Sequence, residues 1–343
     1  TNQQIDGGDG SDTLEVSVNV ASGNFDNIET LEIGGGATAV DLELFDEELD
    51  TVEVETTSNV SLTKIGASHD IETVNGATVT IVSGTSDQAT FIAAGDLTIA
   101  NSSTVTAVED LDLSFTSNSA STLTLTGTAT EKLVIENADA AVALTGAAIT
   151  SAASAVTSID ATALTTALTV GSAAGSGAGN ISAISLGSGN DTAYIDGGQA
   201  GADIDMGDGD DTIDASSNNV AMDYLGGSGK DAIALDGTNN VQDDIVFAET
   251  GDFVIVTSGS TADLDTITGF DSGEDKIDLN ALNLTGIDNG SSLADAYSIV
   301  SGGTADVAYY VTGGDTFVYV DLGSTVGAFE LTSTSAVEAD FNL

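Results

Sequence analysis

The chain has 343 residues, of which 55 are acidic and only four are basic, so its formal net charge is -51. All four basic residues are lysines, and this excludes nucleic acid as a partner because phosphate binding needs clustered lysine and arginine. Binding to an anionic membrane surface is disfavoured for the same reason. No run approaches about 18 apolar residues, so the sequence also argues against membrane insertion.

The charge itself has two explanations that the composition leaves open. Self-repulsion destabilises a compact polyanion, and either bound divalent cations or high salt, as in halophiles, can compensate for it. Disorder of the whole chain is not expected because 41% of its residues are apolar, while partial disorder without metal stays open. Since there is no cysteine, neither disulfides nor thiolate sites can staple the fold, but a hard cation on oxygen ligands can.

Residues 1–24 contain one Gly/Asp block and a short predicted strand. Between residues 25 and 186 the sequence pattern is different. Short runs there alternate apolar and polar residues, as half-buried strands do. Their starts are about 21 to 25 residues apart, and the longer gap after Ile71 accommodates a further turn near Leu97–Ile99. The predicted strands are Ile28–Ile33, Leu49–Val54, Ile71–Val74, Val108–Leu113, Glu131–Ile135, Val156–Asp160 and Ile181–Leu186.

This period indicates an all-β fold, a parallel β-solenoid (β-helix or β-roll) in which each turn buries its apolar face against its neighbours. The alternative is an array of immunoglobulin-like sandwiches, whose strands recur about every 8 to 12 residues. The longer period favours the solenoid. Helical signal is weak, and its best candidate is the short segment Leu293–Tyr297.

The strongest motif is the nonapeptide Gly-Gly-x-Gly-x-Asp-x-U-x, in which U is a large apolar residue. Gly7–Glu15 and Gly226–Ala234 match it fully, and Met206–Asp214 departs only at the first glycine. Leu186–Tyr194 is a close match with a small U, and Gly197–Asp205 is a variant with one inserted residue. A Gly/Asp-rich linker is the alternative interpretation, but near-matches this dense are hard to obtain by chance.

The motif has a physical rationale as a calcium turn. Its glycines allow positive φ, so that backbone carbonyls turn toward a metal, and the aspartate adds a carboxylate oxygen. Calcium takes six to eight such oxygens. If two nonapeptides make one coil, Asp191 faces Asp211 and Asp203 faces Asp231, with an insert at Ala215–Leu225 disturbing the second pair.

The candidate ligands for several Ca2+ ions are the turn glycines, the acidic residues and the asparagine of these blocks, together with three aspartates of the following segment. They are Asp6, Gly8, Asp9, Gly10, Asp12, Gly187, Gly189, Asn190, Asp191, Gly198, Asp203, Gly207, Asp208, Gly209, Asp210, Asp211, Gly227, Gly229, Asp231, Asp271, Asp275 and Asp278.

The nonapeptides resemble the RTX (hemolysin-type calcium-binding) repeats of proteins exported by type I secretion. Asp265–Leu279 and Asp315–Gly323 resemble the cap that follows such repeats, and the tail Ala339–Leu343 is similar to an uncleaved export signal. The repeats between residues 25 and 186, Ser158–Leu164 above all, resemble calcium-binding surface-layer proteins of Gram-negative bacteria. The nonapeptide block is shorter and more interrupted than the resemblance leads one to expect, so some calcium sites would be incomplete or completed by neighbouring loops.

This resemblance implies secretion as an unfolded chain and folding outside the cell in calcium. It implies an N-terminal RTX-like turn in residues 1–24, solenoid repeats in 25–186, an RTX β-roll in 187–237, and a small C-terminal β cap with the export signal in 238–343.

No enzyme is expected from the sequence. His69 is the only histidine and is predicted at a surface or corner position, and neither His-Glu-x-x-His nor Gly-x-Ser-x-Gly occurs. The expected function is that of a calcium-dependent structural protein that assembles with copies of itself into an extracellular surface layer or filament. One alternative is an RTX-type adhesin that binds glycan or ice. The threonine-rich run Thr122–Thr128 favours this alternative. Another is an RTX-fused enzyme whose catalytic part lies outside this chain. Cell-surface polysaccharide is a further candidate partner.

Overall fold

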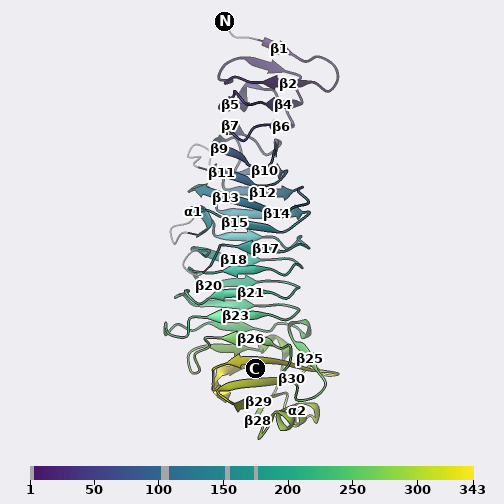
Figure 1. The fold of residues 1–343 in the computed structure, drawn as a ribbon, viewed down its shortest axis with the longest axis vertical. Coiled ribbons are helices and arrows are strands. Elements are labelled where there is room, and N and C mark those ends of the chain that lie inside the picture. The colour runs from purple at the N-terminus through teal and green to yellow at the C-terminus, as the bar shows by residue number, and fades with distance from the viewer. Residues whose placement is uncertain (1–3, 102–107, 151–154, 174–176) are drawn as a thin grey trace. The chain divides into compact units, whose positions relative to one another are not determined.

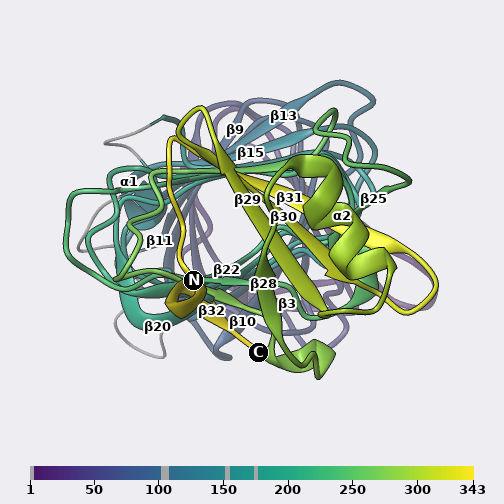
Figure 2. The same cartoon turned by 90° about the horizontal axis from the view of Figure 1, so that it is seen from below.

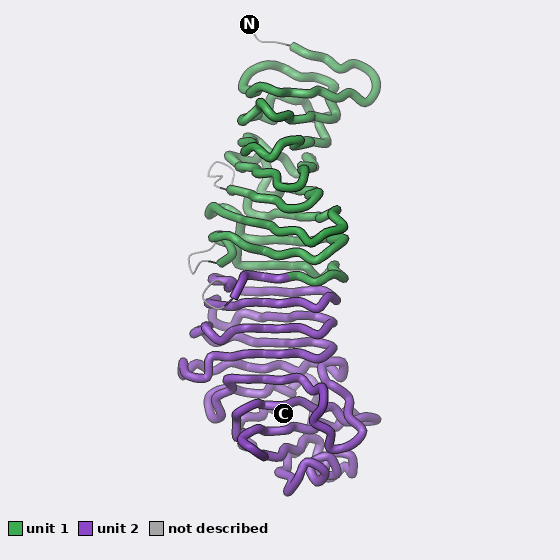
Figure 3. The backbone as a smooth tube through the Cα atoms, viewed as in Figure 1, with its two compact units in different colours: residues 1–168 green, residues 169–343 purple. Residues whose placement is uncertain are grey.

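The computed structural model describes residues 4–101, 108–150, 155–173 and 177–343. The chain forms two compact units, Thr1–Leu168 and Thr169–Leu343, which Figure 3 colours separately. Residues 1–3 of the predicted N-terminal turn lie outside the described residues.

Unit 1 is a parallel β-solenoid in which each coil contributes one strand to each of two facing sheets (Figure 1). Partner strands pair in parallel, for example Leu31 with Val52 and Val52 with Ile71. The strands of its first sheet are β2 (Thr13–Val16), β4 (Thr30–Ile33), β6 (Thr51–Val54), β8 (Asp70–Thr73), β10 (Gln88–Ala93), β12 (Asp110–Phe115), β14 (Lys132–Ala138) and β16 (Ser158–Asp160).

The second sheet of unit 1 faces the first and supplies the other half of each coil. Two short elements, β1 (Gln4–Asp6) and β3 (Asn24–Asp26), pair separately near the start of the chain. The second sheet consists of β5 (Ala39–Asp41), β7 (Asn59–Ile65), β9 (Ala77–Gly84), β11 (Leu97–Asn101), β13 (Ser121–Gly127) and β15 (Val142–Thr145), and the short helices are η1 (Leu42–Leu44) and α1 (Ala147–Thr150).

Period-two alternation builds the core of unit 1. In β13, Leu123 and Leu125 point inward and are fully buried, while the threonines that alternate with them are half-exposed. Because the strands are in register, equivalent apolar residues stack into columns, such as Phe91 against Ile71. Each added coil therefore extends the same core by one layer.

Unit 2 repeats the two-sheet solenoid. Its first sheet consists of β18 (Ile181–Ser185), β20 (Gly198–Asp205), β22 (Met222–Leu225), β24 (Asp244–Val246), β27 (Lys276–Asp278) and β32 (Phe341–Asn342). Its second sheet begins with β17 (Leu168–Val170), β19 (Thr192–Tyr194), β21 (Thr212–Ala215), β23 (Ala232–Leu235) and β26 (Asp265–Thr268).

A small antiparallel cap closes unit 2. Its strand β31 (Val326–Thr332) pairs in parallel with β26 and antiparallel with both β25 (Val254–Val256) and β30 (Asp315–Asp321). Figure 2 shows α2 beside this cap, where Ala296 and Val300 pack on Ala308 and Tyr319. The cap elements are β25 (Val254–Val256), β28 (Ile287–Asn289), α2 (Leu293–Ser301), β29 (Val307–Thr312), β30 (Asp315–Asp321) and β31 (Val326–Thr332), with the short helices η2 (Thr250–Asp252), η3 (Asn280–Leu282) and η4 (Glu338–Asp340).

The all-β parallel solenoid and its C-terminal β cap are confirmed, as is the helix that starts at Leu293. The further turn in the long gap also exists, but its first-sheet strand is Gln88–Ala93, whereas Leu97–Asn101 belongs to the second sheet. The supposed insert at Ala215–Leu225 is wrong: it contains β22, the first-sheet half of the next coil.

Candidate metal centre

Three turns of sequence Gly-x-Gly-x-Asp lead into β19, β21 and β23 and stack one coil apart in unit 2. We call these segments, 187–191, 207–211 and 227–231, the GxGxD turns. A Cβ atom on Gly207 would lie 2.1 Å from the carbonyl oxygen of Gly187, and one on Gly227 would lie 1.8 Å from that of Gly207. Both glycines also have positive φ, at +87° and +90°. Only glycine permits this close stacking of backbone carbonyl groups.

The aspartates of the GxGxD turns form one continuous row. Asp211 Oδ1 accepts a hydrogen bond from the N–H of Asp191 at 2.6 Å, and Asp231 Oδ1 accepts one from the N–H of Asp211 at 2.9 Å. Asp265 extends the pattern, since its Oδ1 accepts from the N–H of Asp231 at 2.9 Å. We call these four residues, each at most 4% exposed, the aspartate row. The predicted neighbourhood of Asp191 and Asp211 is confirmed.

The aspartate row carries carboxylate oxygens without partners. Asp211 Oδ2 and Asp265 Oδ2 are buried without a hydrogen-bond partner of normal geometry among the described residues, although the nearby backbone N–H of Val254 lowers the pKa of Asp265. Burial raises the pKa of Asp211, the hydrogen bond from the N–H of Asp191 lowers it and the neighbouring carboxylates raise it, and the result is a pKa of about 8. Burial likewise raises the pKa of Asp231 and of Asp265 to about 7. Two buried carboxylate oxygens in this row have no partner and burial disfavours their ionised form, so a cation bound beside them would stabilise the row.

The donor set of the row suits calcium, which accepts carboxylates and backbone carbonyls together. Among the described residues, no three acidic or histidine side chains converge closely enough to hold a metal ion by themselves. The stacked carbonyl oxygens of Gly187 and Gly207 accept hydrogen bonds from the N–H groups of Asp208 and Ser228, both at 2.9 Å, so calcium at the GxGxD turns would have to share these oxygens.

The remaining polar residues of the GxGxD turns lie on their exposed side. Asn190 Oδ1 accepts from the N–H of Asp210 at 3.2 Å, and Asp210 Oδ1 accepts from the N–H of Lys230 at 3.0 Å. Asp208 is exposed as well, opposite Ser228 of the next turn.

The second glycines of the GxGxD turns stack in the same way as the first. A Cβ atom on Gly209 would lie 2.0 Å from the carbonyl oxygen of Gly189, and one on Gly229 would lie 1.8 Å from that of Gly209. Each turn therefore contributes two closely stacked glycine positions beside the aspartate row.

The predicted pairing of Asp203 with Asp231 is wrong. Asp203 lies in β20 as an exposed strand residue, and its lateral neighbour is Asp223. The cause is an irregularity in β20, where Gly198 pairs with Ile181 but Asp203 already pairs with Ala183. One coil thus holds one GxGxD turn rather than two, and Gly198 and Asp203 are not brought to the aspartate row.

In unit 1, the first nonapeptide forms the corner before β2. The N–H of Asp12 donates to Glu29 Oε2 at 2.6 Å, so a glutamate takes the place that the next aspartate takes in unit 2. Asp12 Oδ2 is buried without a partner among the described residues. Asp6 Oδ1 accepts from the N–H of Gly8 and from Asn27 Nδ2, while Asp9 and Gly10 are exposed.

The aspartates after the repeats separate into two groups. Asp275 Oδ1 accepts from the N–H of Asp243, and its Oδ2 accepts from the N–H of Asp271, so these three lie together at corners before β24 and β27. Asp243 was not predicted, although burial raises its pKa to about 7. Asp278 lies apart in β27, where its Oδ1 accepts from the N–H of Asn280.

A feature that the sequence interpretation missed is a ladder of glutamates on the outer face of unit 1. Glu15, Glu32, Glu53 and Glu72 pair laterally on β2, β4, β6 and β8, and we call them the glutamate ladder. Burial raises the pKa of Glu53, and the charges of Glu32, Glu72 and Glu55 raise it further. Glu32 and Glu53 occupy the same position in the predicted strands Ile28–Ile33 and Leu49–Val54, and this repeat was the signal that could have revealed part of the ladder.

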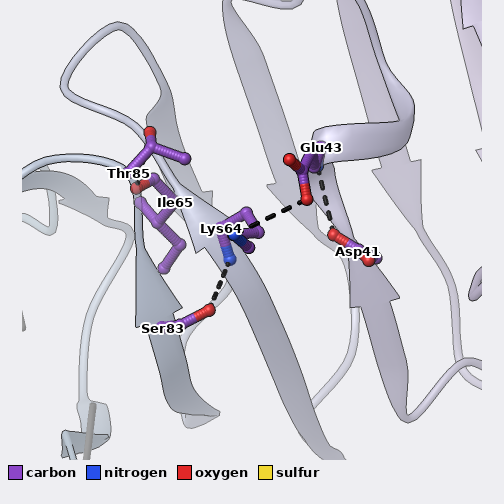
Figure 4. A network of polar contacts seen from close by, with 6 residues as sticks. All are labelled: Asp41, Glu43, Lys64, Ile65, Ser83 and Thr85. Atoms are coloured by element: carbon purple, nitrogen blue, oxygen red, sulfur yellow. Dashed lines mark hydrogen bonds and ion pairs between the residues drawn. The ribbon is translucent and has the colours of Figure 1, made fainter. Parts of the chain in front are cut away.

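The four lysines neutralise little of the chain's negative charge. Lys64 pairs with Glu43 at 3.6 Å, as Figure 4 shows, and Lys230 pairs with Asp263 at 3.6 Å. Four cations cannot neutralise 55 acids. His69 lies at the corner before β8, as predicted for a surface or corner position, where its Nδ1 accepts from the N–H of Gly66 and burial lowers its pKa.

No protein-family model matches the sequence, and no curated protein matches it. No helix among the described residues is long and apolar enough to cross a membrane.

The glutamate ladder predicts that removing one charge stabilises the metal-free chain. Like charges directly opposite each other on neighbouring strands are destabilising, so Glu53→Gln should raise the free energy of unfolding by about 0.5 kcal/mol at low salt without divalent ions. Glu43→Gln is the matched control because it makes the same charge change but removes the ion pair with Lys64. Thermal unfolding followed by circular dichroism measures both. Equal effects of the two variants would contradict the prediction.

The raised pKa values of the aspartate row predict that the stability of the calcium-free chain falls as pH rises. Folded-state pKa values near 7 to 8 exceed those of the unfolded chain, so the folded state binds more protons between about pH 4 and 8. Stability should therefore be greatest at the acidic end and fall as pH rises through 7 to 8. Asp211→Asn, which cannot titrate, should flatten this dependence. A midpoint of thermal unfolding that rises with pH in calcium-free buffer would contradict it.

Proposed function

We propose that this chain is a calcium-dependent structural protein of the RTX class, exported by type I secretion and assembled outside the cell into a surface layer or filament. The observation that carries the proposal is the aspartate row with its unpaired buried oxygens beside stacked glycine carbonyls. A cation on this row would convert a repulsive stack into a stabilising one, because bound calcium favours the folded state that presents its ligands together.

Calcium would also explain export and assembly. Where calcium is scarce, a chain of charge -51 stays expanded, and where calcium is plentiful it condenses. Copies with this charge repel each other, so contacts between them need bridging cations. The carboxylates of the glutamate ladder, two exposed and two half-exposed, are suited to such bridges because they are regularly spaced, about 4.8 Å per strand.

A second candidate function is an adhesin that binds glycan or ice through the second sheet of unit 1. Thr78, Thr98, Thr124 and Thr145 are lateral neighbours on β9, β11, β13 and β15, which makes a regular row of half-exposed threonines. Part of this row is engaged internally, since Thr145 Oγ1 donates to the carbonyl of Leu123 at 3.1 Å. This internal bond leaves fewer hydroxyl groups for a ligand, and we rank the adhesin second.

Electron microscopy of the purified chain with calcium or with EGTA, at matched ionic strength, tests the proposed function. We expect sheets or filaments in calcium that disappear in EGTA. Monodisperse particles in both conditions would overturn the structural role and favour the adhesin. Order that survives EGTA but fails at low salt would point to salt screening instead.

A variant connects this assembly to the aspartate row. Asp211→Asn should need at least about tenfold more calcium to give the same ordered assemblies, because it removes a buried carboxylate ligand. Asp214→Asn is the matched control, since it makes the same charge change three residues away and keeps the acceptor for the N–H of Ser216. If the two variants needed the same calcium concentration, assembly would not depend on calcium bound at the aspartate row.

A further inference from the structure

A cleft lies in the C-terminal cap of unit 2, and no residue of the GxGxD turns lines it. Three segments that are distant in sequence form it: β25 with the residue after it, the C-terminal end of α2, and the turn between β30 and β31. Figure 2 shows α2 and β31 in this part of the molecule. The volume of the cleft is about 490 Å³, and small-molecule sites occupy about 300 to 1,000 Å³. The cap therefore has room for a ligand.

The floor of the cleft is apolar and belongs to the core of the cap. Val256, Val300 and Val326 line it, each at most 7% exposed, and all three belong to the same core cluster as Tyr319. Tyr297 adds a half-buried aromatic side chain, whose ring meets that of Tyr319 edge-on at 86° and 6.2 Å. Because these residues are packed into the core, the cleft is formed before any ligand binds.

The rim of the cleft carries hydroxyl groups and one carboxylate. The hydroxyl groups belong to four exposed residues, Thr257, Ser301, Ser324 and Thr325. The carboxylate is that of Asp321, whose Oδ1 accepts from the N–H of Gly323 at 2.8 Å, and this bond orients the group and leaves Oδ2 for a ligand. Hydroxyl groups both donate and accept, whereas a carboxylate only accepts. The rim therefore suits a ligand that has several hydroxyl groups of its own.

The charge of the cleft disfavours anions. None of the described residues that line it is basic, and Asp321 is acidic. The α2 helix ends at Ser301 in the lining, so the negative end of its dipole lies there as well. The formal net charge of the whole chain, -51, acts in the same direction. Phosphates, carboxylates and acidic sugars would be repelled without finding a cationic partner, and a neutral ligand would not.

We propose that this cleft binds a neutral saccharide. The C–H groups of a sugar ring would pack on the valine floor and on Tyr297, and its hydroxyl groups would exchange hydrogen bonds with the rim and donate to Asp321 Oδ2. The inference does not depend on calcium binding or on assembly. It also differs from the adhesin alternative, whose threonine row lies in unit 1.

Saturation-transfer difference NMR on the full chain in calcium-containing buffer tests the proposal. The probes are three neutral disaccharides, cellobiose, lactose and mannobiose, and one acidic sugar, glucuronate. We expect at least one of the neutral disaccharides to bind and glucuronate not to bind. Binding of none of the three, or equally strong binding of glucuronate, would overturn the proposal.

A variant at the carboxylate locates the binding in the cleft. Asp321→Asn keeps an acceptor for the N–H of Gly323 but removes the charge, so the affinity for the bound disaccharide should fall at least about tenfold. Asp315→Asn is the matched control, since Asp315 lies at the other end of β30, outside the cleft, and also accepts one backbone N–H, from Ser333 at 2.8 Å. The control should bind as the unaltered chain does. Equal affinities of the two variants would contradict the site.

A second pair of variants tests the cleft by filling it. Ser301→Trp should abolish saccharide binding because the indole occupies the space at the end of α2. Ser298→Trp places the same side chain on an exposed residue of the same helix that does not line the cleft, and it should leave binding unchanged. Circular dichroism confirms that each variant is folded. Equal effects of the two substitutions would overturn the site while calcium-dependent assembly could still hold.

Discussion

The parallel in-register stacking of coils is the constraint on which the rest of this protein depends. It places any residue that recurs once per coil into a row, with neighbours about 4.8 Å apart. Apolar residues in such rows make a continuous core, as Ile71 and Phe91 do. Acidic residues in such rows concentrate negative charge, both inside the turns at Asp211 and Asp231 and outside at Glu53. The same geometry thus stabilises the core and places like charges next to each other, where bound cations would offset their repulsion.

Much of the fold was predictable because the solenoid repeats local information. Alternation gave the first-sheet strands, and the spacing between them indicated coils. The strand at Leu97–Asn101 was assigned to the wrong place because period-two alternation does not say which of two sheets a strand joins. The strands began a residue or two later than predicted where the first residues form the corner, as at Glu29, whose N–H donates to the carbonyl of Asp12.

The candidate site was predictable only where its spacing was regular. Asp191, Asp211 and Asp231 are 20 residues apart, and their row followed from the repeat. Asp265 is 34 residues from Asp231, so the intervening segment hides its position in the row. Asp203 was misplaced because the irregular pairing of β20 moves it onto the outer face of the strand.

Folding of the full chain during a calcium titration tests most directly whether calcium neutralises these rows. Far-ultraviolet circular dichroism should show a reduced β-sheet signal in calcium-free buffer at low salt and a cooperative gain as calcium is added. Neither magnesium nor sodium chloride at matched ionic strength should reproduce that gain. A full β-sheet signal without calcium, or an equal gain with sodium chloride, would contradict a specific role for calcium and would assign the charge to screening by salt.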